Sequence, residues 1–122
     1  MEDRIRFIEH KGKQILLADC SYCTAEELET MSRLVPSYVT AEPKESVLLL
    51  ADFTGAQFDR VAIERLKLDL VFDRPHLKRS AWVGTETLPN IFYEHLKSFS
   101  QRELPTFKTR EEAMDWLVAE QR

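Results

Sequence analysis

The sequence predicts an α/β fold, a mostly parallel five-stranded sheet with four helices in the order ββαβαβαβα. Three observations support this prediction. Residues 46–51 are expected to form a strand that helices cover on both faces, because residues 47–51 are an unbroken apolar run. Residues 5–18 have the pattern of a β-hairpin. After the hairpin, apolar stripes at helical spacing alternate with short strand-like segments, which is typical of parallel strands joined by helices.

The first half of the chain has clear boundaries between its elements. Residues 5–10 alternate apolar and polar side chains, and a Lys-Gly-Lys turn leads into a second strand. Thr24 and Glu27 form a capping box that begins a helix, because the threonine accepts from the backbone while the glutamate reaches back. After the buried strand, we expect the next helix to begin near Asp59 and to end before Pro75.

The second half continues the alternation of strands and helices. Residues 80–84 are expected to form a short strand, and Thr87 to cap a third helix with Pro89 in its first turn. Residues 104–107 predict a last short strand, and Thr109 begins a final helix with a second capping box. The apolar stripe expected for the third helix consists of Ile91, Phe92, His95, Leu96 and Phe99.

The composition predicts one globular domain over residues 1–122, located in the cytoplasm. A chain of 122 residues is long enough for one core and too short for two. The formal net charge of −4 argues against a nucleic-acid partner, which needs a basic surface. No apolar run approaches the roughly 20 residues that span a membrane. The charged start of the chain lacks the apolar core of a secretion signal.

The predicted topology gathers the ends of the parallel strands at one edge of the sheet, because crossovers between such strands are right-handed. This edge, which we call the loop rim, collects residues 20–21, 52–55, 84–87 and 108–109. Ligands and partners of α/β proteins bind just beyond the carboxyl ends of the strands, so the loop rim is the expected functional surface. The residues expected to contact a partner or a phosphate are Asp52, Phe53, Thr54, Gly55, Phe58, Gly84 and Thr85.

Three types of residue define the expected chemistry of this surface. Phe53 and Phe58 would offer apolar contact to a protein partner, including a second copy of the chain. Gly55 and Gly84 let another backbone approach closely. Thr54 is the hydroxyl residue of the loop after the buried strand. It either caps a helix that begins early, or accepts a phosphate or contacts an anion.

Four segments, residues 12–16, 47–55, 78–84 and 107–117, carry a family resemblance over almost the full length. On these motifs the chain resembles STAS-type, SpoIIAA-like domains, a group linked by fold to the SEC14 lipid-transfer type. The resemblance implies a non-enzymatic regulatory or protein-interaction domain whose partner is a regulatory protein or a kinase. In regulatory STAS proteins, a kinase phosphorylates a serine or threonine after the central strand. Thr54 matches that position, although the usual Asp-Ser-Ser-Gly run is Asp-Phe-Thr-Gly here.

Two other functions remain open at this point. The first is suggested by the link in fold to the SEC14 lipid-transfer type. If the aromatic side chains lined a groove, the protein would suit the role of a carrier of a lipid or another small apolar ligand. Cys20 and Cys23 form a Cys-x-x-Cys motif before a helix, which is typical of thiol oxidoreductases. Two cysteines without neighbouring histidines do not make a zinc site. Neither a metal, nor a cofactor, nor a converging set of catalytic residues is expected.

Overall fold

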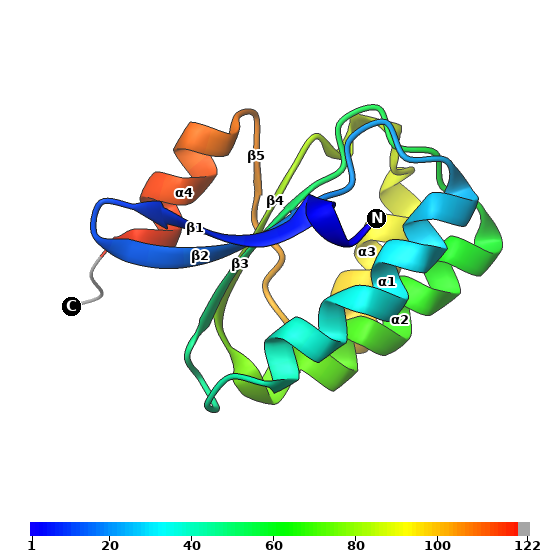
Figure 1. The fold of residues 1–122 in the computed structure, drawn as a ribbon. Coiled ribbons are helices and arrows are strands. Elements are labelled where there is room, and N and C mark those ends of the chain that lie inside the picture. The colour runs from blue at the N-terminus through cyan, green and yellow to red at the C-terminus, as the bar shows by residue number, and fades with distance from the viewer. Residues whose placement is uncertain (120–122) are drawn as a thin grey trace.

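The structure, a computed structural model, describes residues 1–119 and contains one mixed five-stranded sheet (Figure 1). Its strands lie in chain order. β1 (Ile5–His10) pairs antiparallel with β2 (Lys13–Asp19), and β3 (Val47–Asp52), β4 (Leu77–Val83) and β5 (Thr106–Phe107) continue the sheet in parallel. The predicted α/β class with one antiparallel hairpin is confirmed. The last three residues of the domain predicted over 1–122 lie outside the described residues.

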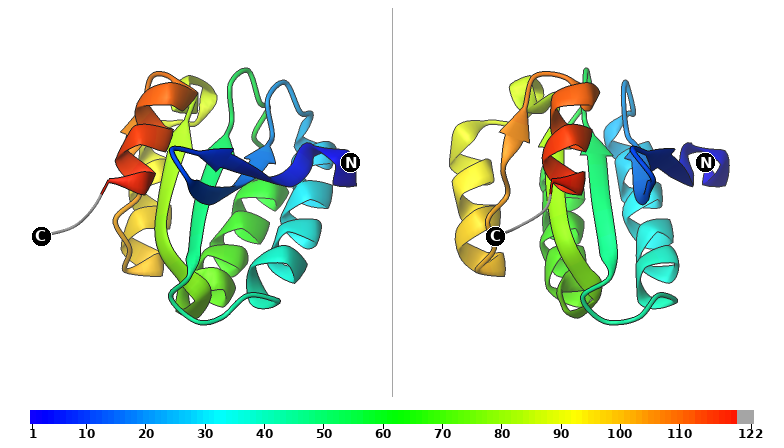
Figure 2. Two further views of the ribbon diagram at one scale, coloured as in Figure 1. Left: turned by 60° about the vertical axis from the view of Figure 1, so that its left-hand side comes forward. Right: turned by 90° about the vertical axis from the view of Figure 1, so that its left-hand side faces the viewer.

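The helices cover the two faces of the sheet unequally (Figure 2). α1 (Ala25–Thr40), α2 (Arg60–Asp73) and α3 (Asn90–Ser100) form a layer on one face. α4 (Arg110–Val118) alone packs on the opposite face. Each crossover that joins parallel neighbours in chain order has the same hand, so the three connecting helices must share one face.

The central strand β3 divides the interior into two cores. Every residue of β3 is buried. Leu49 and Ala51 face the larger core beneath α1 to α3, whereas Leu48 and Leu50 face the smaller core beneath α4. Alternating side chains of a strand point to opposite faces, so a strand with a core on both sides needs apolar residues at every position. This arrangement explains the unbroken apolar run of the sequence.

Three helix starts agree with the sequence, and one of them is Thr109, whose Oγ1 accepts from the Glu112 N–H at 3.1 Å at the start of α4. Thr24 Oγ1 accepts from the Glu27 N–H at 3.1 Å, and the Glu27 carboxylate accepts from the Thr24 N–H at 3.0 Å, which completes the capping box of α1. Asp59 caps α2 by accepting from the Ala62 N–H at 2.8 Å. Since α2 begins there, Thr54 lies five residues before its cap and does not begin the helix.

The predicted start of the third helix is wrong. Thr87 belongs to the short 3-10 turn η3 (Thr85–Thr87), and α3 begins after Pro89 without a side-chain cap. The buried Leu88 explains the delay, because the extended backbone that inserts its side chain into the core separates the turn from the helix. Of the predicted apolar stripe, Leu96 is buried, whereas Ile91, Phe92, His95 and Phe99 are exposed.

Candidate functional site

The loop rim has the geometry that the topology predicts, with the loops after β2, β3 and β4 side by side at one end of the sheet (Figures 1 and 2). Asp19 and Asp52 are register partners at the ends of β2 and β3. The chain leaves both strands by the same turn. Asp19 Oδ1 accepts from the N–H and the hydroxyl of Ser21 at 3.1 and 2.6 Å. Asp52 Oδ1 accepts from the N–H and the hydroxyl of Thr54 at 2.9 and 2.6 Å.

Arg110, the first residue of α4, bridges the two aspartates. Its Nη2 lies 3.1 Å from Asp19 Oδ1, and its Nε donates to Asp52 Oδ2 at 2.6 Å. Burial works to raise the pKa of Asp19, but hydrogen bonds from Ser21 and the Arg110 guanidinium together hold that pKa below its usual value. Asp52 is only 5 % exposed, and Arg110 together with the Thr54 turn supplies hydrogen bonds to both oxygens of its buried carboxylate.

Gly84 closes the loop rim over Thr54. Its backbone is left-handed, with φ of +70°, and a Cβ there would lie 2.2 Å from Thr54 Oγ1 and 2.5 Å from the Thr54 nitrogen. Only glycine allows both the conformation and the approach. The Thr54 hydroxyl therefore lies between the Asp52 carboxylate, to which it donates, and the backbone of the next loop.

Tyr22, directly beside the loop rim, is its most prominent exposed side chain. It is 75 % exposed, yet its backbone is fixed, because its N–H donates to the Thr54 carbonyl at 2.7 Å. The ring lies over Gly55, where a Cβ would come within 2.4 Å of it. Ile91, in the first turn of α3 after the β4 loop, is equally exposed. The sequence analysis identified neither residue as a contact, because the Cys-x-x-Cys motif around Tyr22 indicated a dithiol site instead.

Phe53 and Phe58 are not the exposed contact residues that the sequence predicted. Phe53 is only 2 % exposed, and its ring packs 5.5 Å from Phe58 and 5.1 Å from Trp82 between centroids. Phe53 keeps the side-chain alternation of β3 and so points into the core beneath the helices. Phe58 is half-buried against the same core. Both residues support the loop rim from below. Of the other predicted contacts, Thr85 is half-buried and Gly55 is exposed.

The two cysteines do not form the reactive dithiol considered from the sequence. Both side chains are buried, and burial raises the pKa of Cys20 and of Cys23. Arg4 Nη1 donates to Cys23 Sγ at 2.8 Å, which only partly offsets the effect of burial. The helix begins after Thr24, so its N-terminus does not activate Cys20. A thiolate nucleophile has no support in this geometry.

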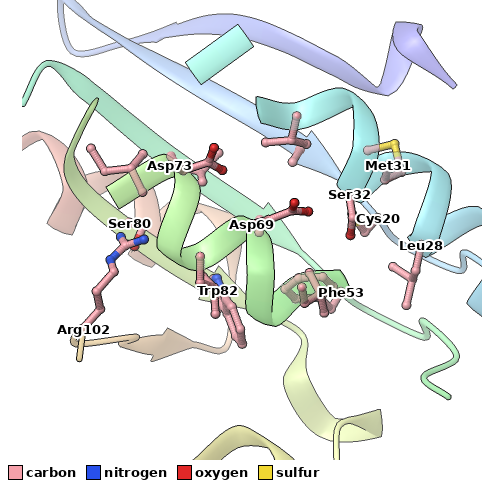
Figure 3. Close-up of a pocket in the computed structure, with 17 residues that line it drawn as sticks. Cys20, Leu28, Met31, Ser32, Phe53, Asp69, Asp73, Ser80, Trp82 and Arg102 are labelled. Atoms are coloured by element: carbon pink, nitrogen blue, oxygen red, sulfur yellow. The ribbon is translucent and has the colours of Figure 1, made fainter. Parts of the chain in front are cut away.

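A partly enclosed cavity of about 60 Å³ lies between the sheet, α1 and α2 (Figure 3). Its walls are mostly apolar, but Asp69, Asp73 and Arg102 also line it. Sites for drug-sized ligands enclose about 300–1,000 Å³, so this cavity is too small to hold a lipid. Sequence reasoning missed the two acids. Their spacing of four residues on the same side of α2 as Leu66 and Leu70 was the available signal.

Two further searches cover residues 1–119. No three His, Cys, Asp or Glu side chains gather there in a way that would hold a metal ion. None of the helices in this range combines the length and the apolar character that crossing a membrane requires.

Comparison with known proteins gives one match. The sequence profile described as SpoIIAA-like matches residues 21–118, which includes the loops after β2, β3 and β4 and nearly all of α4. No curated protein and no solved structure matches the chain. The match includes three of the four segments that carry the resemblance seen in the sequence, residues 47–55, 78–84 and 107–117, whereas residues 12–16 precede it.

Proposed function

Because the chain belongs to the SpoIIAA-like family, we propose that it is a non-enzymatic regulatory domain that binds a protein partner at the loop rim. The observation that carries the proposal is Tyr22, a large exposed side chain on a fixed backbone. Tyrosine is enriched among the residues that dominate binding energy, because it offers apolar area and a hydroxyl at little entropic cost. Ile91 supplies further exposed apolar surface at the start of α3.

Thr54 is the proposed control point of this surface. Its hydroxyl donates to one oxygen of Asp52, while Arg110 holds the other oxygen. Phosphorylation would remove that donor and place about two negative charges beside the carboxylate. Arg110, which contacts the same carboxylate, could pair with the new phosphate, and its shift toward the phosphate would release Asp52 and α4. Since Gly84 covers the hydroxyl, a kinase gains access only when the β4 loop moves.

Site-specific photo-crosslinking in the cells that make the protein tests the proposed surface. A photoreactive phenylalanine analogue replaces Tyr22, and in a control chain it replaces Phe72, which is 70 % exposed on α2 away from the loop rim. We expect one covalent protein adduct of defined mass from position 22 and none from position 72. Equal adducts from both positions, or none from position 22, would contradict the proposal.

Phosphopeptide mapping of the same protein tests the control point. Ser21 is a built-in reference, because it makes the same pair of hydrogen bonds to its aspartate on the neighbouring strand. We expect phosphate on Thr54 and none on Ser21, and Thr54→Val should abolish the modification with little loss of stability. Phosphate confined to Ser21, or absent from both residues while the partner is bound, would exclude Thr54 as the switch.

A further inference from the structure

The cavity beneath α1 and α2 has features of a binding site that the proposed function does not use. Leu28 and Met31 of α1 and Trp82 of β4 form part of its apolar wall. Asp69 and Asp73 enter from α2, one helical turn apart, and Arg102 enters from the segment after α3 (Figure 3). Charged side chains rarely line so small an apolar space unless something in it meets their hydrogen-bonding needs.

Three polar atoms of these residues are buried without a hydrogen-bond partner. They are Asp69 Oδ2, Asp73 Oδ1 and Arg102 Nη1. Asp73 is only 4 % exposed, so water outside the protein does not reach its carboxylate. Nη2 of Arg102 donates to Ser80 Oγ, which fixes the guanidinium at the cavity wall. Buried polar atoms are nearly always paired, so the two unpaired carboxylate oxygens at one cavity indicate an occupant that donates hydrogen bonds.

The charges of the wall define the kind of occupant. Among the described residues that line the cavity, the charged ones are two acids and one base. Burial raises the pKa of Asp69 to about 7, with the nearby Asp73 adding to the rise and Arg65 opposing it. Burial also raises the pKa of Asp73 to about 6, against the opposing effect of Arg102. With two acids facing one base, the wall carries excess negative charge when both acids are ionised, and an anion would be repelled.

We propose that the cavity binds a small primary ammonium ion with a short apolar body. Its N–H groups would donate to the unpaired oxygens of Asp69 and Asp73, and its single positive charge would balance the excess acid. Its carbon atoms would lie against the apolar wall. Since one water-sized group takes up about 15 Å³ of the free space in a cavity and about 30 Å³ in the liquid, 60 Å³ corresponds to about two to four non-hydrogen atoms, as in methylammonium to propylammonium. A ligand of this size binds with a Kd in about the millimolar range.

The two tryptophans give an internal comparison for a test by nuclear magnetic resonance. Trp82 lines the cavity, whereas Trp116 lies on α4 across the sheet. Methylammonium, ethylammonium or propylammonium chloride is titrated into ¹⁵N-labelled protein at pH 8, where both acids are ionised. We expect the indole resonance of Trp82 to shift and saturate, and that of Trp116 to stay in place. Sodium chloride at matched ionic strength and tetramethylammonium chloride, which has no N–H donor, should leave both unchanged.

Conservative variants separate binding from folding. Asp69→Asn and Asp73→Asn keep the side-chain shape, and the dispersion of the spectrum reports whether each variant is folded. We expect each to weaken the Trp82 response at least tenfold in Kd, whereas Asp59→Asn at the exposed helix cap should leave it intact. No Trp82 shift with any amine would mean that the cavity holds only water. An equal response to tetramethylammonium, or in folded Asp69→Asn, would likewise overturn the proposal.

Discussion

Replacing Asp69 by asparagine tests how the acids of the cavity make the stability of the fold depend on pH. Burial raises the pKa of Asp69 from 3.8 to about 7 in the folded protein. The folded state therefore holds the proton more tightly than the unfolded chain does. The stability gained in this way is fully present below about pH 4 and is lost as the pH rises through about 7.

The size of this stability effect follows from the difference between the folded and unfolded pKa values of Asp69. At about 1.4 kcal/mol per pH unit between 3.8 and about 7, the full effect on the free energy of unfolding is about 4 kcal/mol. About 2–3 kcal/mol of this falls between pH 5 and pH 8. Asparagine has nearly the same shape and no charge to bury. Relative to the wild type, Asp69→Asn should therefore gain about 2–3 kcal/mol between pH 5 and pH 8, from about 1–2 kcal/mol more stable at pH 5 to about 4 kcal/mol more stable at pH 8.

Urea denaturation followed by far-UV circular dichroism at both pH values measures this difference. Asp59→Asn is the matched control, because it removes an exposed acid of the same helix and asparagine caps a helix as well as aspartate does. The control should follow the wild type at both pH values. The reasoning fails if Asp69→Asn is no more stable than the wild type at pH 8, or if the control changes the pH dependence equally.

Three further predictions concern the loop rim and its surroundings. Arg110→Met should lower the free energy of unfolding by about 2–4 kcal/mol, because it leaves the buried Asp52 without its cation, and an unchanged urea midpoint would contradict that bridge. Gly84→Ala should lower the free energy of unfolding by at least about 2 kcal/mol. Gly12→Ala, which is also at positive φ but has open space around it, should lower it by about 1 kcal/mol. Equal decreases in the two variants would show that crowding at Gly84 is unimportant. Both cysteines should resist a thiol reagent in the native protein at pH 7 and react on unfolding, and fast reaction of either in the native state would contradict their burial.

The sequence predicted those features of the fold that are determined by residues close together in the chain. The apolar run of β3, the Thr24 capping box and the Asp59 cap each depend on neighbours within a few residues, so the pattern alone locates them. The loop rim follows from topology, because right-handed crossovers leave the strand ends few alternatives. These features place Asp52 and Thr54 correctly without any knowledge of their partners.

The remaining features depend on contacts between distant parts of the chain. Arg110 reaches Asp52 from 58 residues away, and nothing local distinguishes it from other arginines at a helix start. Asp69 and Asp73 have the sequence pattern of surface acids, and only the packing of α1 against α2 encloses them. Phe53 looked exposed because it follows the strand, although it keeps the strand's alternation and points into the core.

Native mass spectrometry of the protein isolated from its own cells tests most directly whether the loop rim is the partner surface. The wild type is compared with Tyr22→Ser and with Phe72→Ser, which removes an exposed aromatic ring on α2. The account predicts a complex of fixed stoichiometry for the wild type and for Phe72→Ser, and its loss in Tyr22→Ser. A bare chain in all three samples, or a complex that survives Tyr22→Ser, would contradict it.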